Sequence, residues 1–315
     1  MISTVVVSLL LSSYVSAHGW MASVTIEGTT YLGNTPNASP NRSVIRQIND
    51  VDPVKGASNP FMNCGQDAQL AAEVATANPG DQIQFSWVNG DAGPWVHNVG
   101  PMQTYMTSCG TQNCASFNSS DASWFKISEQ GRITTGGDWF MSNMNSGAPA
   151  NVTIPANIAP GNYLIRHELI ALQIAQTPGG AEFYPSCVQV AIAGNGTGAP
   201  TAEETVQLPG AYSDSDPGLV VDVYSNRDAD YIFPGPPVAA FVNATFSATN
   251  SSSNPSPDST VNIFTPPTAV SSADSSATSS SCMDRREVND DAYVVRPAQQ
   301  RPRTLSRVMK SLVSQ

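Results

Sequence analysis

Hydrophobic residues in this chain occur as short runs rich in β-branched and aromatic side chains, separated by segments rich in Gly, Pro, Asn and Thr. Four such runs are Ala22–Ile26, Gln82–Trp87, Tyr163–Ile174 and Val188–Ile192. Runs of this length between turn residues are typical of antiparallel strands. No long segment repeats its hydrophobic residues with the period of an amphipathic helix. The pattern therefore predicts an all-β protein.

Turn signals support this prediction and indicate how the strands are joined. The sequences PGD at 79–81 and PGN at 160–162 are typical of turns between strands. The simplest arrangement is a single β-sandwich of about 225 residues with long loops. In such a sandwich the loops usually carry the function.

The composition changes near Asn243 and marks the end of the predicted sandwich domain, residues 18–243. Residues 244–281 are mostly Ser, Thr, Pro, Ala and Asn, which are too polar to build a core. We expect a disordered, O-glycosylated linker there. Residues 282–315 form a polar tail that becomes basic from Arg296 onward. One cysteine and one aromatic residue are too few for a small disulfide-stapled cellulose-binding module, so the tail is predicted to be disordered as well.

Residues 1–17 resemble a secretory signal peptide. An apolar run, Val5–Leu11, is followed by the small residues Val15 and Ala17 at the positions that signal peptidase recognises. The apolar run is too short to span a bilayer, and no later stretch is long enough. We therefore expect a secreted, extracellular protein without a membrane partner, whose mature chain begins at His18.

The charge of the chain indicates which class of partner it can bind. The formal net charge is -11, and only 12% of the residues are charged. Binding to nucleic acid needs a basic surface, which this composition argues against. A neutral polysaccharide is a suitable partner. Glycosylation sequons, each of which needs an exposed position in a secreted chain, begin at Asn37, Asn41, Asn118, Asn151, Asn195, Asn243 and Asn250.

The five cysteines fit an oxidising compartment. A bond between Cys64 and Cys187 would close a long loop and restrict the unfolded chain. Cys109 and Cys114 could close a local loop, and Cys282 in the tail is left over. The spacing of Cys109 and Cys114 could also suggest zinc, but no second pair and no nearby histidine support that interpretation.

Cleavage after Ala17 would create a metal-binding residue. His18 would gain a free amine and so offer two nitrogens, the amine and one imidazole nitrogen. A third nitrogen must come from His97 or His167, the other two histidines. Nitrogen-rich, planar ligation favours copper(II). Because the ordinary pKa of an α-amine is about 8, a metal can displace its proton at mild pH.

Each histidine also has an ordinary interpretation. His18 can be a surface residue that happens to follow the cleavage point. His97 lies in the loop GPWVHNVGP, where a solvated side chain is the common case. His167 lies in a strand-like run between Arg166 and Glu168, and we favour a structural hydrogen-bonding role for it.

A set of motifs runs in order through residues 18–243. They are HGW at His18, HNVGP at His97, WFKI at 124–127, IPANIAPGNYLIRHELIAL at 154–172, GAEFYPSC at 180–187, PGAY ending at Tyr212, DPG at Asp216 and PGPPV at Pro234. In these motifs the chain resembles fungal lytic polysaccharide monooxygenases of auxiliary activity family 9, formerly glycoside hydrolase family 61. HGW alone is a weak signal, whereas the ordered set is specific.

The resemblance implies a fold and a metal site. The fold would be an immunoglobulin-like (fibronectin-like) β-sandwich with a flat substrate face around one copper ion. His18 would bind copper through its amine and one ring nitrogen, and His97 through one ring nitrogen. Tyr184 would place its phenol oxygen at the axial position. Without the resemblance, Tyr184 would be interpreted as a core tyrosine with a satisfied hydroxyl.

The activity implied by the resemblance is oxidative cleavage of cellulose or another β-1,4-glucan. An external electron donor, either a small reductant or cellobiose dehydrogenase, would reduce the copper. Oxygen or hydrogen peroxide would be the co-substrate, and hydrogen would be abstracted at C1 or C4 of a sugar. We expect a monomer. Tyr212 is a candidate for stacking on a sugar ring, although a packed tyrosine before a turn is an equally good interpretation.

The resemblance also implies both disulfides. Cys64 would pair with Cys187, and Cys109 with Cys114. A glycoside hydrolase has no comparable support, because hydrolysis normally needs two carboxylates that face one cleft, and nothing in the sequence places such a pair.

The chain departs from the family pattern at two positions, Gln173 and Glu182, where the family usually has histidine and glutamine. In the family this pair hydrogen-bonds the oxygen species and the axial tyrosine. Gln173 can donate through its amide and ionised Glu182 can only accept, so the two can satisfy each other. Copper(II) nearby would favour the charged form of Glu182, and burial the neutral form.

This exchange leads to two hypotheses. In one, activity requires protonated Glu182, which shifts the pH optimum toward acid; in the other, the exchange changes nothing measurable. The same departure is the feature that favours an alternative function, a secreted copper-binding or glucan-binding protein with lost or reduced oxidative turnover.

Overall fold

The alternation of side chains in strand β4 (Gln82–Asn89) shows how the sequence builds a sandwich. The computed structural model describes residues 17–225, 227 and 229–243. In β4, Ile83, Phe85 and Trp87 are buried and the residues between them are more exposed. Successive side chains of a strand point to opposite faces, so these three share the face that packs on a second sheet.

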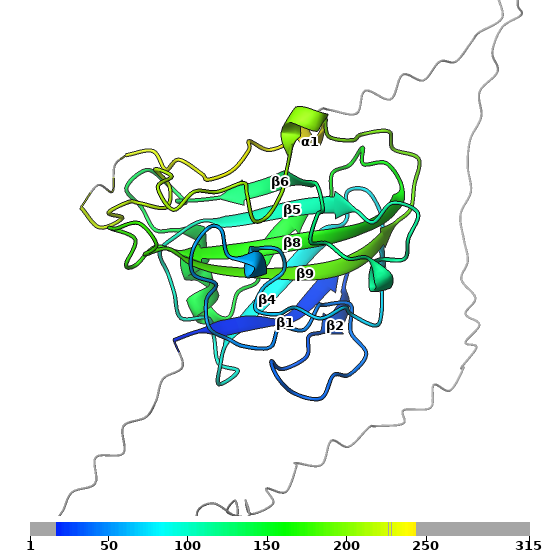
Figure 1. Ribbon diagram of the computed structural model, residues 1–315, viewed down its shortest axis with the longest axis horizontal. Coiled ribbons are helices and arrows are strands. Elements are labelled where there is room, and N and C mark those ends of the chain that lie inside the picture. The colour runs from blue at the N-terminus through cyan, green and yellow to red at the C-terminus, as the bar shows by residue number, and fades with distance from the viewer. Residues whose placement is uncertain (1–16, 226, 228, 244–315) are drawn as a thin grey trace, which may run out of the picture. The chain divides into compact units, whose positions relative to one another are not determined.

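The strands form two sheets (Figure 1). One has four strands in the order β2-β1-β4-β7, and the other has six in the order β10-β6-β5-β8-β9-β3. Neighbouring strands are antiparallel, except that β3 runs parallel to β9. The predicted all-β sandwich is confirmed. The remaining strands are β1 (Gly19–Ile26), β2 (Thr29–Leu32), β3 (Ala75–Ala77), β5 (Met102–Ser108), β6 (Trp124–Gln130), β7 (Ala150–Thr153), β8 (Gly161–Ala171), β9 (Glu182–Ile192) and β10 (Thr205–Val206).

Helices are short throughout the described part of the chain. One α-helical turn, α1 (Ala240–Asn243), closes it, and 3₁₀ turns cover Pro60–Met62, Cys114–Ser116, Phe140–Ser146 and Ala202–Glu204. Within the described ranges, no helix has the length and apolar character needed to cross a lipid bilayer. The predicted signal peptide lies outside the described residues except for Ala17. The predicted linker and tail, with Cys282 and Asn250, lie outside them entirely.

His167 lies between the two sheets and joins them. Its ring stacks on Phe85 of β4 at a centroid distance of 4.3 Å. Its Nδ1 accepts a hydrogen bond of 3.2 Å from Nε1 of Trp87. Burial, with a smaller contribution from the neighbouring Arg166 cation, lowers the pKa of His167 to about 3. His167 is therefore a neutral core residue, in agreement with the structural role that we favoured.

Two predicted strand boundaries differ from the observed ones. The apolar run Tyr163–Ile174 is longer than β8, which ends at Ala171 because Leu172 donates its N–H to the Val99 carbonyl instead. Conversely, β9 begins six residues before the predicted Val188. Pro185 interrupts the apolar pattern there, yet it still pairs with β8 in the ladder.

Both disulfides that the resemblance implied are present. Cys64 is bonded to Cys187, 123 positions away, which ties a long loop to β9. Cys109 is bonded to Cys114 and closes the loop after β5. The first bond restricts the unfolded chain strongly, because it closes a long segment.

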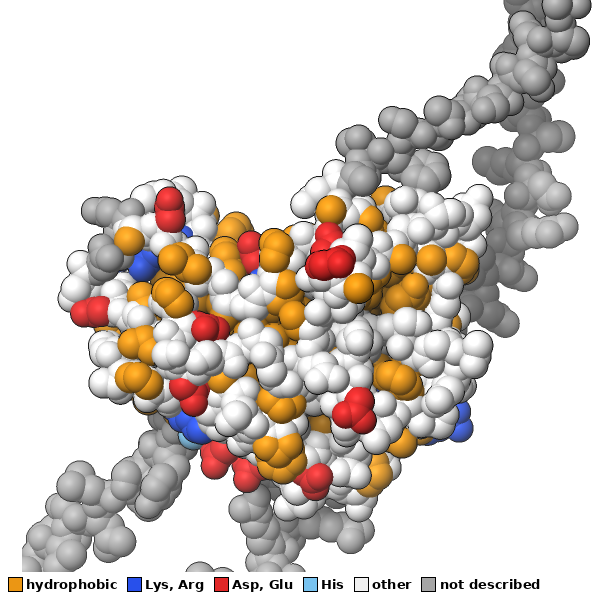
Figure 2. Space-filling view, turned by 45° about the horizontal axis from the view of Figure 1, so that its top comes forward, with side chains coloured by type: hydrophobic (Ala, Val, Ile, Leu, Met, Phe, Trp, Pro, Cys, Tyr) orange, Lys and Arg blue, Asp and Glu red, His pale blue; other side chains and the backbone are white. Residues whose placement is uncertain are grey.

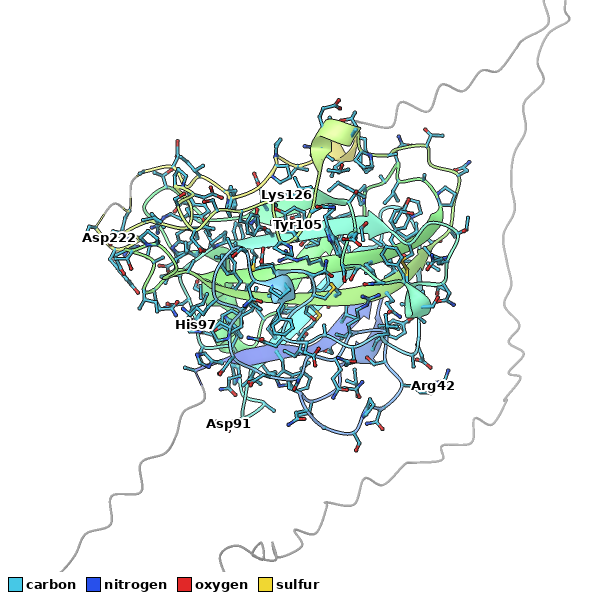
Figure 3. The ribbon with its side chains drawn as sticks, viewed as in Figure 1. Arg42, Asp91, His97, Tyr105, Lys126 and Asp222 are labelled. Carbon is cyan, nitrogen blue, oxygen red and sulfur yellow. A yellow bond between two sulfur atoms is a disulfide. The ribbon has the colours of Figure 1, made fainter. Side chains whose placement is uncertain are left out.

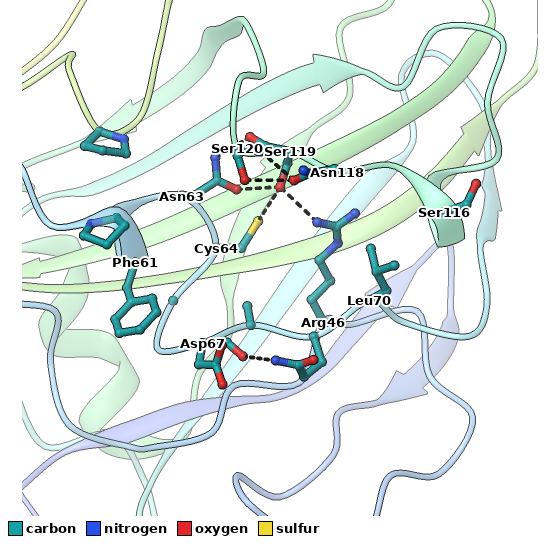
Figure 4. A pocket seen from close by; sticks show the side chains of 15 residues that line it. Arg46, Phe61, Asn63, Cys64, Asp67, Leu70, Ser116, Asn118, Ser119 and Ser120 are labelled. Carbon is teal, nitrogen blue, oxygen red and sulfur yellow. Dashed lines mark hydrogen bonds between the residues drawn. The ribbon is translucent and has the colours of Figure 1, made fainter.

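A groove of about 590 Å³ lies beside the Cys64 end of the first disulfide (Figure 4). Arg46 in its wall is buried and donates to Ser119 Oγ at 2.9 Å and to the Phe117 carbonyl at 2.7 Å. Asn63 donates to the Ser119 carbonyl at 2.6 Å. The Arg46 and Asn63 side chains therefore cross-link the surrounding loops.

Candidate metal centre

The position of His18 is fixed by close contact between two backbones. His18 directly precedes β1, and its carbonyl accepts a hydrogen bond of 2.7 Å from the Gly90 N–H. At Gly19 a Cβ atom would lie 1.9 Å from the Val88 carbonyl oxygen, so any side chain there would push β1 away from β4. The glycine of the HGW motif therefore lets β1 approach β4 and holds His18 at the end of this strand pair.

The loop between β4 and β5 carries His97. Trp95 anchors the loop: it is 1% exposed, and its ring meets the His97 ring edge-on at 5.3 Å. Asn145 donates to the Trp95 carbonyl at 2.7 Å. Gly100 has a φ of 136°, and a Cβ there would lie 1.8 Å from the Ile170 carbonyl oxygen. The loop is therefore pressed against β8 and holds His97 in place.

Tyr184 brings the two histidines into one site. It is 4% exposed, and its hydroxyl lies 3.1 Å from Nε2 of His97. Its ring lies 5.6 Å from the His97 ring and 6.4 Å from the His18 ring, measured between centroids. Tyr184 is the third residue of β9, so it shares a face of that strand with Glu182, the first residue.

The peptide bond before His18 lies at the same place. The main chain of Ala17 lies beside the His97 ring, where it raises the pKa of the imidazole against the larger effect of burial. Cleavage after Ala17 would thus release the His18 amine beside the His97 ring. His18 Nδ1 lies 2.6 Å from Asp52 Oδ1 in the uncut chain. Nδ1 is also the ring nitrogen through which a chelate with the residue's own amine can close.

The protonation states suit a metal with nitrogen ligands. Burial lowers the pKa of His97, although Glu182 opposes this shift, so the imidazole is neutral at neutral pH and has a lone pair to donate. Burial, reinforced by Glu182, raises the pKa of the Tyr184 phenol, which stays protonated. A neutral phenol is a weak ligand. Two imidazoles, an amine and a weak oxygen donor fit copper(II).

This site differs from one built of side chains alone. Among the residues that the structure describes, no group of three or more His, Cys, Asp and Glu side chains is placed to hold a metal ion. Two histidines need a further donor, and here that donor can be the main-chain nitrogen of His18. A metal site built this way would therefore depend on cleavage of the chain.

Gln173 and Glu182 form the hydrogen bond that the sequence allowed. Gln173 Nε2 donates to Glu182 Oε2 at 2.6 Å, and the Tyr184 hydroxyl donates to the same oxygen at 3.3 Å. The other oxygen, Oε1, lies 3.1 Å from Nζ of Lys55. Burial alone would raise the pKa of Glu182. The hydrogen bond and charge of Lys55, with further contributions from Gln173 and His97, outweigh burial and hold it below its ordinary value.

Lys55 is a residue of this site that the sequence did not reveal. It lies 127 positions before Glu182, and nothing in its local sequence indicates a site. An ionised, paired Glu182 gives no support to the hypothesis that activity requires its protonated form. Lys55 is brought to the site by the backbone pairing of Val54 with Phe183, which is seen in the fold and not in the sequence.

The profile of Auxiliary Activity family 9 (formerly GH61) matches residues 18–231, which include every residue of this site except Ala17. The chain belongs to this family. Lytic polysaccharide monooxygenase D of Gloeophyllum trabeum is 50% identical over 230 residues, covering 73% of this chain and 66% of the relative, so the chain spans just under two thirds of that relative's length. Lytic polysaccharide monooxygenase B of Heterobasidion irregulare is 33% identical, covering 71% of this chain and 92% of the relative.

Solved structures of family 9 share the fold. The crystal structure of HiLPMO9B matches with a TM-score of 0.63 and 32% identity, over 70% of this chain and 99% of that one. A cellulose-active polysaccharide monooxygenase from M. thermophila matches with a TM-score of 0.63 and 34% identity, over 70% and 98%.

Tyr212 does not have the exposure that we predicted for a sugar-stacking residue of this family 9 domain. It is only 7% exposed, and its hydroxyl donates to Glu168 Oε2 at 2.8 Å. The same hydroxyl accepts from Gln103 Nε2 at 3.1 Å and lies 3.0 Å from the Tyr105 hydroxyl. The stacking prediction is therefore wrong. Tyr212 is the packed tyrosine of the alternative interpretation, because Glu168, buried beneath it, needs a hydrogen-bond donor.

Tyr224 has the exposure that Tyr212 lacks, with 55% of its surface accessible. Its loop is attached near the site, because Val221 donates its N–H to the Ala175 carbonyl at 2.8 Å, two residues after Gln173. The sequence did not show which of these two tyrosines is exposed, since both directly precede Ser in segments outside the predicted strands.

Proposed function

We propose that this chain, once cut after Ala17, is a copper-dependent lytic polysaccharide monooxygenase that cleaves cellulose or a related β-1,4-glucan. The observation that carries the proposal is the meeting of the Ala17–His18 peptide, the His97 ring and the Tyr184 phenol at one point. The family match, which begins at His18, supports the cleavage position. The 34% identity to a cellulose-active monooxygenase supports the substrate.

Each residue of the site has a distinct task in this proposal. The amine and Nδ1 of His18 and Nε2 of His97 would hold the copper. Bound copper supplies one-electron redox chemistry, driven by an external donor with oxygen or hydrogen peroxide as co-substrate. Tyr184 keeps its proton and presents a neutral hydroxyl. Glu182 accepts a hydrogen bond from that hydroxyl and so orients it.

Secretion agrees with several features of the sandwich. Two disulfides are typical of an oxidising compartment. The asparagines of all six sequons within the described residues are exposed, as glycosylation requires: Asn37, Asn41, Asn118, Asn151, Asn195 and Asn243. Acidic side chains are spread over the face in Figure 2, in keeping with a neutral rather than an anionic partner. The monomeric state and the identity of the electron donor stay predictions.

A second function has a specific observation in its favour. Glu182, which pairs with Lys55, puts a carboxylate where the family usually has an amide. A secreted copper-binding or glucan-binding protein with reduced turnover would have the same fold and the same histidines. Catalytic turnover therefore decides between the two functions, and copper binding alone does not.

The test is product analysis with cleaved, copper-loaded protein on amorphous cellulose, with ascorbate and oxygen, at acid and neutral pH. Mass spectrometry should detect aldonic acids or 4-keto sugars, and these should be absent with His97→Ala. The oxidised product would also identify C1 or C4 attack. Copper binding without oxidised sugars on several glucans would favour the second function, and absence of copper binding would reject both.

A further inference from the structure

Lys55 is brought to the candidate metal centre by backbone pairing. Val54 and Phe183 exchange hydrogen bonds of 2.8 and 3.1 Å in an antiparallel bridge. In that register the next residue, Lys55, comes opposite Glu182. Its side chain is 43% exposed, and Nζ also approaches the Gly180 carbonyl at 3.4 Å. The ammonium group therefore lies at the surface and reaches inward to the carboxylate.

The two carboxylate oxygens of Glu182 have different partners, one toward the surface and one within the site. Oε1 faces Lys55 at 3.1 Å. Oε2 accepts from Gln173 at 2.6 Å and from Tyr184 at 3.3 Å, and lies 3.7 Å from Nε2 of His97. The side chain is only 8% exposed, so few water molecules can replace these partners.

Because the Glu182 carboxylate is nearly buried, removing the half-exposed Lys55 ammonium would leave its charge less compensated, which costs more than the loss of a pair with both partners exposed. Here the consequence would extend to Gln173, whose Oε1 is buried without a partner. Its bond to Glu182 is thus the interaction that orients the amide, because a flipped amide would set two acceptors against each other. A displaced Glu182 would release Gln173 and Tyr184 together.

We propose that Lys55 is a positioning residue: its ammonium holds Glu182 so that Oε2 stays against Tyr184 and His97. The expected loss of activity rests on the proposed function. The expected displacement of Glu182 rests on the ion-pair geometry alone. Lys55 and Glu182 together then present a neutral pair where a neutral amide would otherwise stand, which makes the carboxylate compatible with the site.

The test uses four variants of the full-length secreted protein: Lys55→Met, Lys55→Arg, Glu182→Gln and the double variant Lys55→Met/Glu182→Gln. Outer partners of metal ligands typically contribute roughly 10- to 100-fold to metal affinity or activity. Because Lys55 acts on the ligands through Glu182, we expect Lys55→Met to lose about tenfold in oxidised product, the lower end of that range, and to change the copper(II) electron paramagnetic resonance spectrum. Lys55→Arg should restore both, and Lys55→Met should have no further effect on Glu182→Gln.

Arg42→Met is a matched control. Arg42 also pairs with an acid, Glu73, but its side chain is 82% exposed and it lies across the molecule from His97 (Figure 3). This variant should leave product formation and the spectrum unchanged, because an exposed ion pair contributes little.

Metal-free protein gives a readout that does not depend on turnover. The ring nitrogen resonances of His97 should shift in Lys55→Met and return in Lys55→Arg. An inactive wild type with these shifts would reject the proposed function and uphold the positioning role. Unchanged His97 resonances and an unchanged copper(II) spectrum in Lys55→Met would overturn the inference. It would also be overturned if Lys55→Arg failed to restore the resonances and the spectrum, or if Lys55→Met had its full effect in the Glu182→Gln background.

Discussion

Tyr212 and Tyr224 stand twelve positions apart in sequence and have opposite environments. The Tyr212 hydroxyl is surrounded by Glu168, Tyr105 and Gln103, whereas the Tyr224 ring is 55% exposed. A residue that satisfies a buried carboxylate contributes to stability, and an exposed ring is available to a sugar. Their substitutions should therefore affect different properties.

Tyr212→Phe should destabilise the fold and leave glucan binding unchanged. It removes a hydroxyl that donates to buried Glu168, and an unsatisfied buried acceptor costs about 1–3 kcal/mol. Urea unfolding of the two proteins measures this difference. A loss of cellulose affinity without a loss of stability would contradict the buried role and revive the stacking prediction.

Tyr224→Ala should have the converse effect. We expect a several-fold loss of affinity for cellulose and a stability within about 0.5 kcal/mol of the wild type, as is usual for exposed positions. Pull-down on cellulose, compared with Tyr212→Phe as the partner variant, separates the two effects. Equal binding by Tyr224→Ala and wild type would show that the exposed ring does not contact the substrate.

Individual site residues could be predicted only where their residue type and sequence neighbours were informative. His18, His97 and Tyr184 were predicted through motifs, because their residue types and neighbours are specific to the site. Lys55 was not, because its relevance depends on the pairing of Val54 with Phe183, a contact between distant segments. For Tyr212, local sequence carries no information on whether a ring is covered by other elements.

At the scale of elements, the close pairing of β1 with β4 positions the candidate metal centre. Gly19 pairs with Asn89 in this ladder, and its missing side chain allows the approach. Strand existence was predictable for β1, β4, β8 and β9 because their apolar runs are dense. The first half of β9 was not, since Pro185 and its polar neighbours hide a strand that is buried on both faces.

Gly19→Ala should displace His18 and weaken copper binding. The added Cβ would lie 1.9 Å from the Val88 carbonyl oxygen, so β1 has to move, at a cost of about 1–3 kcal/mol. Copper titration and thermal unfolding measure the two consequences. Gly28→Ala is the control: it has a positive φ of 79° but no atom within 4 Å of a Cβ, so it should cost about 1 kcal/mol and leave copper affinity intact.

At the scale of the whole molecule, the two sheets meet around a histidine whose charged form is disfavoured by burial. Folding lowers the pKa of His167 from 6.5 to about 3, so below pH 6.5 the unfolded chain binds a proton that the folded chain does not. Stability must therefore fall as the pH drops from 6.5 toward 3, by up to about 1.4 kcal/mol per pH unit from this group.

His167→Gln should make the pH dependence of stability shallower. Glutamine can still accept from Trp87, but it has no proton to gain in this range. Free energies of unfolding in urea should be measured from pH 7.5 to pH 4.5. Above pH 7 the two proteins should show the same dependence of stability on pH. Below pH 6.5 the wild type should lose stability more steeply than His167→Gln. Parallel profiles throughout would mean that His167 does not control acid stability.

In the proposed function the free amine of His18 completes the copper site, and changing the N-terminus of the protein shows whether it does. Two copper-loaded proteins should be compared, one beginning at His18 and one that retains Ala17, by copper titration and by mass spectrometry of the products from cellulose. We predict tight, one-to-one copper binding and oxidised oligosaccharides for the first protein, and loss of both for the second. Equal copper affinity and equal product from the protein that retains Ala17 would contradict this claim.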